Sequence, residues 1–323
     1  MKTIAIITTL SSLCVFPSFG QIAQTRPDLC GKPDGVIPLP PNITASVDRS
    51  SGRADLLLLI NDAAPVKIRV PGGVDELDEL CPVSDGRRVV LFGTAGHTTN
   101  INVIDQANGA LLDSFYGTTP LMSPNQRWLV YRKFSPAHTD LPVSEEYLLY
   151  DLSKNAAQNR QPQITASDRM DVGAPIFPKG QKNLVLDQIG VPEDQQHEFR
   201  SDSFFWAPDS SAVAFADSVK DHLAIVLVTI DGGGNPSAYV HAVPISEVCS
   251  GEVSMPDTET LLEIREARVV LEGNGHYVVQ VESHSSDSAC VPKTLQLHLS
   301  DFSPAKAETH EPTKFTFKSV QGR

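Results

Sequence analysis

Short apolar runs, bracketed by turn-forming residues, dominate the chain from residue 54 onwards. Most of them are too short for the helices of a globular protein, and Gly, Pro, Asn or Asp flank them. In Thr258–Arg268 the apolar residues instead sit among Glu and Arg, and we expect a short helical insertion there. The pattern predicts strands at Ala54–Ile60, Val66–Val70, Val89–Phe92, Ile101–Ile104, Trp128–Tyr131, Tyr147–Tyr150, Val213–Phe215, Leu223–Ile230, Tyr277–Val281 and Leu295–Leu299.

The predicted strands repeat in a fixed order: a turn, an apolar strand, a loop, a second strand and an aspartate. The turn centres on Asp85, Asn125, Asp209 and Asn274, which lie 40, 84 and 65 residues apart. The first two intervals fit one and two units of about 42 residues, the length of a four-stranded propeller blade. The third interval does not fit. We expect a diverged copy inside the long gap, where Pro178-Lys179-Gly180 precedes Asn183–Asp187.

The turn motif resembles the repeats of TolB-type and WD-type β-propellers. Trp206-Ala207-Pro208-Asp209 with Ile230-Asp231 is the best copy, and Ser123-Pro124-Asn125 is a good one. Ser84-Asp85-Gly86 lacks the proline, and no copy has the Gly-His and Trp-Asp pairs of a complete WD repeat. The resemblance implies an all-β fold, a β-propeller of four-stranded blades. Four blades are supported, and the length has room for six or seven.

The N-terminus predicts export. Lys2, an apolar run and Ser18-Phe19-Gly20 indicate a signal peptide over residues 1–20 and a secreted or periplasmic protein. A lipoprotein signal at Cys14 competes, but Leu13 stands where a small residue is expected. We expect a proline-rich extended lead-in over residues 21–45, the propeller over 46–303 and a tail over 304–323. Asn42 begins a glycosylation sequon, which is informative only if the host glycosylates.

The other four cysteines, Cys30, Cys81, Cys249 and Cys290, indicate two disulfides in an exported chain. Four cysteines allow three pairings. We favour Cys30–Cys81 and Cys249–Cys290, because each bridge then joins adjacent units. Since no C-x-x-C spacing is present, we expect neither redox catalysis nor a zinc knuckle.

Net charge and missing motifs argue against several classes of partner and of catalytic site. A net charge of −13 argues against nucleic acid and anionic lipid as partners. No run of apolar residues after the leader is long enough to span a membrane. The chain lacks Gly-x-Ser-x-Gly, a phosphate-binding loop and His-Glu-x-x-His. We therefore expect no cofactor, no catalytic residues and no metal.

A histidine follows each turn in the second loop of its unit, at His97, His138, His222 and His284. Imidazoles around one propeller mouth could hold a ligand or a metal. The alternative is that histidine is simply common in polar loops. We take these four residues as candidate ligand-binding positions only.

Repeated aspartates and tryptophans have structural explanations. Turn closure explains the Asp after each second strand better than calcium binding or acid catalysis does. Trp128 and Trp206 occupy repeat positions, which favours the core over a sugar platform, and Asp231–Asn235 indicates a hairpin turn. We interpret Asp75–Glu79 as solvated surface. The aspartates concerned are Asp105, Asp151, Asp231 and Asp301.

The leading hypothesis is a monomeric, non-catalytic β-propeller that binds a protein or a small ligand on one loop-rich face. The runner-up is a propeller enzyme, a hydrolase or lyase with its site at the channel mouth. A protein with a purely structural role in the cell envelope is the third possibility.

Overall fold

Antiparallel strands make up almost all of the regular structure. The computed structural model describes residues 30, 43–50, 52, 55–60, 64–69, 74–96, 98–133, 147–159, 172–176, 204–219, 222–250, 262–271, 276–285, 291–292 and 294–304. Within these ranges the helices are single turns: α1 (Ala156–Asn159), α3 (Ile245–Val248) and the 3-10 helix η4 (Leu299–Asp301). The all-β prediction is therefore confirmed.

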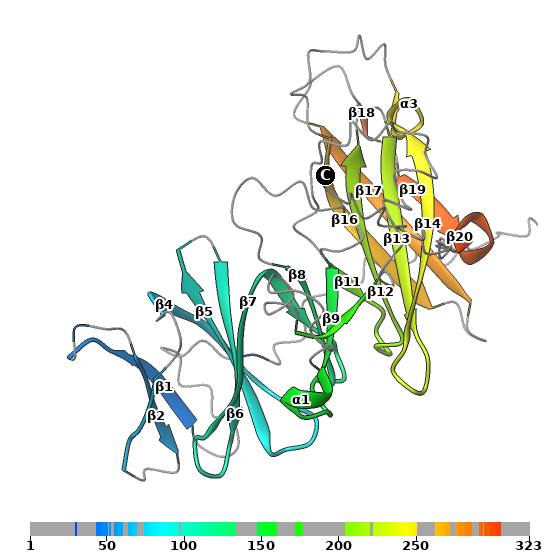
Figure 1. Cartoon of the computed structure of the whole chain (residues 1–323). Coiled ribbons are helices and arrows are strands. Elements are labelled where there is room, and N and C mark those ends of the chain that lie inside the picture. The colour runs from blue at the N-terminus through cyan, green and yellow to red at the C-terminus, as the bar shows by residue number, and fades with distance from the viewer. Residues whose placement is uncertain are drawn as a thin grey trace, which may run out of the picture.

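The strands form successive sheets in chain order (Figure 1). A three-stranded sheet contains β1 (Ile43–Asp48), β2 (Asp55–Ile60) and β3 (Val66–Ile68). A seven-stranded sheet follows, with β4 (Glu76–Pro82), β5 (Arg88–Ala95), β6 (Thr98–Asp105), β7 (Leu111–Met122), β8 (Trp128–Lys133), β9 (Tyr147–Asp151) and β10 (Ala174–Pro175).

Three more sheets complete the described strands. One contains β11 (Phe205–Trp206), β12 (Ala212–Val219), β13 (His222–Ile230), β14 (Pro236–Pro244) and β20 (Ser303–Pro304). Another contains β16 (Leu262–Leu271), β17 (Tyr277–Ser285) and β19 (Thr294–His298). The small strands β15 (Cys249–Ser250) and β18 (Val291–Pro292) pair with each other.

The seven-stranded sheet is two meanders that share the long strand β7. The first part of β7 pairs with β6 as far as Gly117, and the last part of β7 pairs with β8. The register shifts between Thr118 and Leu121, and Thr119 between them has φ of 49°. A positive φ is unusual for a β-branched residue. The strand therefore changes direction here, and β4–β7 and β7–β10 each form a four-stranded unit.

Apolar cores join each unit to the next. One lies between β1–β3 and the β4–β6 face, and a second between β5–β7 and β8–β9. The third joins β8–β9 to β12–β13, and the fourth joins the opposite face of β12–β13 to β16, β17 and β19. The strands β5, β8, β12 and β13 are thus buried on both faces. Double burial explains why they read as continuous apolar runs rather than as alternating ones.

A series of packed antiparallel meanders, of which β4–β7, β7–β10 and β11–β14 are four-stranded, is the arrangement expected of propeller blades. The strands of the described part of the chain form no closed ring, and the predicted blade at Asn183–Asp187 lies outside that part. The architecture is therefore propeller-like, with the number of blades still a prediction.

The predicted helix at Thr258–Arg268 is wrong. Residues from Leu262 onwards form β16, a ten-residue strand that pairs with β17 from Leu271↔Tyr277 to Leu262↔Ser285. The Glu and Arg residues suggested a helix, but pairing with β17 and burial of Val269 in a core override that local preference.

One predicted disulfide is present. Cys30 and Cys81 are bonded, which ties a residue preceding β1 to strand β4. Cys290 lies outside the described residues, so the bond between Cys249 and Cys290 stays a prediction.

The core between β8–β9 and β12–β13 provides a test of how strongly the units depend on each other. The Phe215 ring lies 4.2 Å from that of Tyr147 and 5.5 Å from that of Phe204, and its side chain is fully buried. We expect Phe215→Ala to lower the free energy of unfolding by about 3–5 kcal/mol, measured by urea denaturation. Leu112→Ala, at an exposed position, is the control and should change it by less than about 0.5 kcal/mol. Equal effects of the two substitutions would contradict the packing described here.

Candidate functional site

Three turns have the same hydrogen bonds although their sequences differ. In each, the first residue donates its N–H to the carbonyl of the sixth and accepts from the N–H of the fourth. The side chain of the third residue also accepts from the fifth residue's N–H, at 2.8–3.1 Å. These turns, Val83–Arg88, Ser123–Trp128 and Ala207–Ala212, join β4 to β5, β7 to β8 and β11 to β12. The repeat anchors Asp85, Asn125 and Asp209 are therefore structurally equivalent, as the motif predicts.

The fourth residue of each turn is left-handed. Gly86, Gln126 and Ser210 have φ of 64°, 59° and 63°. Glycine adopts this conformation freely, whereas residues with a Cβ are disfavoured there. The sequence motif is defined by its proline and aspartate, but the backbone conformation restricts the residue that follows them.

Hydrogen bonds link the turns of successive units. The N–H of Ser84 donates to the carbonyl of Gln126 at 3.2 Å, and the N–H of Asn125 donates to Ser210 Oγ at 2.8 Å. The hydroxyl of Tyr277, the first residue of β17, donates to Ser211 Oγ at 2.8 Å. Four successive units thus meet at one end of their sheets, which we call the turn end.

The repeated aspartates close turns, as predicted. Asp105 Oδ1 accepts from the N–H of Ala107 and Asp151 Oδ1 from that of Ser153, at 2.8 and 2.9 Å. Asp231 Oδ1 accepts from the N–H of Asn235, and Asp301 Oδ2 from that of His298, both at 2.8 Å. The carboxylates are thereby used in local structure.

The strand register shows that Asp231 does not occupy the same position as the repeated aspartates Asp105 and Asp151. Asp105 and Asp151 lie opposite the first residue of the preceding strand, but Thr229 occupies that place in β13. Asp231 comes two residues later and begins the hairpin turn to β14, in which Gly234 has φ of 84°. The predicted hairpin is confirmed, although its aspartate is not the counterpart of the other two.

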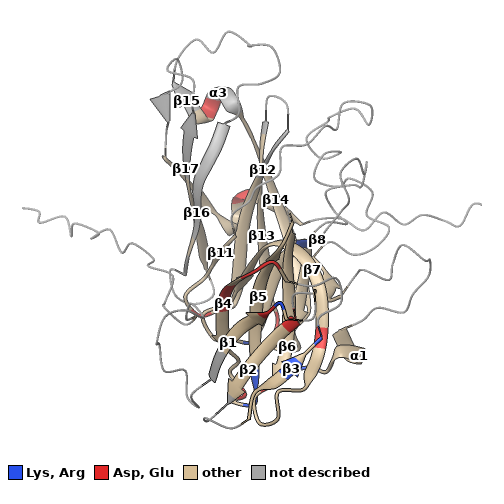
Figure 2. Ribbon diagram, turned by 90° about the vertical axis from the view of Figure 1, so that its left-hand side faces the viewer, with Lys and Arg blue, Asp and Glu red and all other residues tan. Residues whose placement is uncertain are grey.

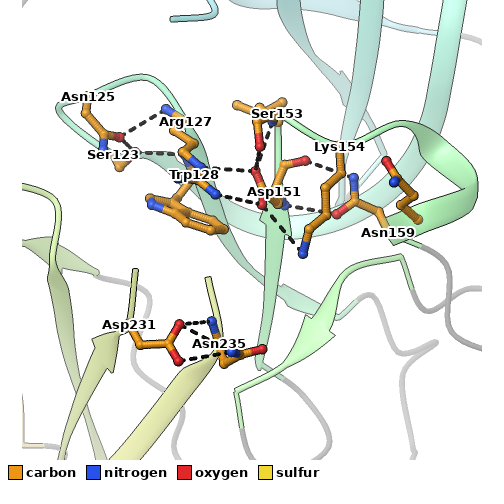
Figure 3. Close-up of polar contacts among 12 residues, drawn as sticks. Ser123, Asn125, Arg127, Trp128, Asp151, Ser153, Lys154, Asn159, Asp231 and Asn235 are labelled. Atoms are coloured by element: carbon orange, nitrogen blue, oxygen red, sulfur yellow. Dashed lines mark hydrogen bonds and ion pairs between the residues drawn. The ribbon is translucent and has the colours of Figure 1, made fainter. Parts of the chain in front are cut away.

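A charged cluster at the turn end surrounds Asp151 (Figure 3). Arg127 donates to both carboxylate oxygens, at 3.4 and 3.2 Å, and Lys154 Nζ lies 3.6 Å from Oδ2. The Arg127 guanidinium also lies 4.3 Å from the centre of the Trp128 ring. Burial raises the pKa of Asp151, but hydrogen bonds from Arg127 and Ser153 outweigh it, and the pKa is below its ordinary 3.8.

Two units also contact the next one through the first residue of their second strand. Arg88 Nη1 donates to the carbonyls of Leu152 and Lys154, at 2.5 and 2.7 Å. Its counterpart Trp128 packs so closely on Gly234 that a Cβ there would lie 2.5 Å from the ring. Trp128 and Trp206 are both 4% exposed and belong to the same core, which confirms the core assignment.

The candidate binding surface is the opposite end of the sheets, which we call the loop end. Because the strands alternate in direction, the connections after the second and fourth strand of a unit start and finish there. Residues 134–146 connect β8 to β9, residues 177–203 connect β10 to β11, and residues 251–261 precede β16. At the turn end, residues 152–173 connect β9 to β10, whereas the other connections between paired strands there are short. Long connections in a compact domain commonly carry function.

The candidate histidines also belong to the loop end by topology. His222 opens β13 opposite Val219, and His284 lies in β17 opposite Glu263. Both are strand residues, not loop residues as expected, and their side chains are outside the described part. His97 and His138 lie outside it entirely. Their role in ligand binding stays a prediction.

Acidic residues line the start of β4 at the loop end (Figure 2). Asp75 and Glu76 are exposed, in agreement with the predicted solvated surface. Asp78 is half-buried at a register irregularity and accepts from Thr94 Oγ1 at 3.0 Å. The acidic run is therefore partly built into the strand. No helix in the described ranges is long and apolar enough to cross a membrane.

No family model and no curated protein matches this chain. Three solved structures similar to it are putative TolB from Agrobacterium tumefaciens, TolB from Acinetobacter baumannii and the β-propeller domain of the trilobed protease from Pyrococcus furiosus. Their sequence identities are 16%, 13% and 10%, and their TM-scores 0.24, 0.24 and 0.27. The similarities cover 62%, 81% and 77% of this chain.

The similar structures thus include TolB and other β-propeller proteins, as the turn motif predicts. The chain spans 61%, 66% and 66% of the length of these three. With TM-scores this low, the fold assignment depends on the sheet order and the cores of the chain itself.

The left-handed turn position predicts opposite effects of two substitutions. At Gly86 an added Cβ would have no atom within 4 Å, so Gly86→Ala tests backbone conformation alone. We expect it to lower the free energy of unfolding by about 1–2 kcal/mol. Gln126→Gly, at the equivalent position, should raise it by up to about 1 kcal/mol. Urea denaturation measures both, and destabilisation by the glycine substitution would contradict the shared turn geometry.

The Asp151 cluster predicts a pH effect on stability. Because the pKa of Asp151 is lower in the folded than in the unfolded chain, its contribution is present above its ordinary 3.8 and is lost as the pH falls through the folded value. We expect the stability of Asp151→Asn to fall less steeply than that of the wild type below pH 3.8. Urea denaturation across this range measures the difference, and parallel curves for the two proteins would argue against the cluster.

Proposed function

We propose that the chain is an exported, non-catalytic binding module that holds a protein or other ligand at its loop end. The asymmetry between the two ends supports this proposal. At the turn end, the turns between the first and second strands are short and use their polar groups in bonds between and within turns, and residues 152–173 are the one long connection between described strands of a unit there. The long connections at residues 134–146, 177–203 and 251–261 attach to the other end.

The turn end supplies the rigidity that a binding module needs. Links between successive units hold the strands in register, so the strand ends at the far side keep fixed positions. A rigid scaffold that presents variable connections is a common way to build a binding surface. Pre-organised strand ends also reduce the ordering cost of binding.

The described surface suggests polar rather than apolar contacts. Leu112 is the exposed large hydrophobic residue among the described positions, at 42% exposure. Acidic Asp75 directly before β4, Glu76 in β4 and Glu247 in α3 are exposed at the loop end. We expect the partner to be recognised by hydrogen bonds and charge rather than by a large apolar patch.

Position-dependent crosslinking tests the proposal. A photo-crosslinking residue placed at Glu76 or Glu247 should capture the same partner from the native medium, identified by mass spectrometry. The matched positions at the turn end are Ala107 and Gly232, both exposed, and they should capture nothing above background. Replacement of residues 136–144 by a short Gly-Ser linker should abolish capture and leave the circular dichroism spectrum unchanged.

Crosslinking from the turn-end positions distinguishes binding at the loop end from binding elsewhere. Capture from Ala107 or Gly232 as strong as that from Glu76 would place binding elsewhere and refute the loop-end assignment. Absence of a specifically crosslinked partner at all four positions would refute the binding function itself.

A further inference from the structure

A carboxylate lies beside the disulfide. The sulfurs of Cys30 and Cys81 and a carboxylate oxygen of Glu79 all lie within 4.8 Å of one another. Glu79 and Cys81 are two residues apart on β4, so both side chains point to the same face of the strand. Cys81 is fully buried, whereas Cys30 and Glu79 are half-buried. The sheet therefore fixes two of the three groups.

Reduction of the disulfide would change the electrostatics of this group. Two thiolates and a carboxylate within 4.8 Å would repel one another, which disfavours the ionised form unless a cation is present. Thiolate sulfur and carboxylate oxygen are both ligands of Zn²⁺, at about 2.3 Å and 2.0–2.2 Å. Tetrahedral geometry at such bond lengths separates two sulfurs by roughly 3.7 Å. The donors thus need only small movements to surround one ion.

We propose that Cys30, Cys81 and Glu79 form a redox-dependent site for a thiophilic divalent cation such as Zn²⁺. In the oxidised protein the disulfide links Cys30 to β4, and in the reduced protein the metal provides the link instead. The site does not depend on the proposed binding function, because it uses neither the loop-end connections nor the histidines.

The chemistry balances with a dithiol as reductant. The dithiol gives two electrons and two protons, becomes a disulfide itself and converts Cys30 and Cys81 to thiols. Both thiols lose their protons when the sulfurs bind the metal. The Glu79 carboxylate is the third ligand, and water occupies the fourth position of a tetrahedral site.

The sequence predicted no metal site, because cysteine spacing was the criterion. Cys30 and Cys81 are separated by 51 residues, far from any C-x-x-C motif. The Glu79-x-Cys81 spacing on one strand was the available signal, and it becomes informative only once the partner of Cys81 is known.

Cobalt binding to the whole chain tests the site. After reduction by a dithiol and removal of the reductant without oxygen, titration with Co²⁺ should produce thiolate-to-cobalt absorbance that Zn²⁺ then abolishes. The oxidised protein should give none. A Cys30→Ser/Cys81→Ser protein retains the other cysteines and measures their background.

Two further variants separate the carboxylate from general effects of charge. Glu79→Gln keeps both thiols and should bind Co²⁺ at least about tenfold more weakly. Glu76→Gln removes an exposed acid of the same strand and should bind like the wild type. Circular dichroism should show that the reduced, zinc-loaded chain keeps its strands.

Equal absorbance in the reduced wild type and the double serine variant would overturn the proposal. So would equal Co²⁺ affinity in wild type and Glu79→Gln. Loss of strand structure on reduction that Zn²⁺ fails to restore would also overturn it, because the metal would then not replace the disulfide.

Discussion

Burial of the inner sheets on both faces is the constraint on which the structure depends. The strands β12 and β13 contribute Val213, Phe215 and Val226 to one core and Ala214, Ile225 and Leu227 to the next. A sheet with two apolar faces is stable only between two neighbours. The units therefore stack in chain order, and their connections are forced to the two ends. Both the turn end and the loop end are consequences of this packing.

Polar links at the turn end then fix how neighbouring units are aligned. Apolar packing is non-directional, so it brings sheets together without setting their offset. The bonds from Ser84 to Gln126 and from Asn125 to Ser210 are directional and join equivalent turns of successive units. Arg88 and Trp128 contact the following unit at a second point. Together these contacts align neighbouring units at the turn end.

Much of the fold follows from local sequence, because the features concerned are local. The predicted strands around Val89, Trp128 and Leu223 are confirmed, and so are the core positions of both tryptophans. The turn anchors Asp85, Asn125 and Asp209 are confirmed too, while Asn274 lies outside the described residues. Contacts between residues far apart in the sequence cannot be predicted from local patterns. Ser210 lies 85 residues from Asn125, and Leu152 lies 64 residues from Arg88. The strand β16 was mistaken for a helix for the same reason, since its partner β17 decides its structure.

The sequence predicts less about the functional site than about the fold. The sequence marked the histidines, but the described structure places His222 and His284 in strands. That three of the long connections attach to one end follows from strand direction across several sheets, which local sequence patterns do not show. The group of Cys30, Glu79 and Cys81 likewise required a contact between the lead-in and β4.

Native-state amide hydrogen exchange tests the central claim most directly. The N–H groups of Ser84 and Asn125 donate to the neighbouring unit, so these bonds should slow their exchange. The account predicts that both exchange as slowly as amides in the middle of β5 and β8. Exchange of these two amides at the rate of a free surface turn would show that the units are not linked at this end.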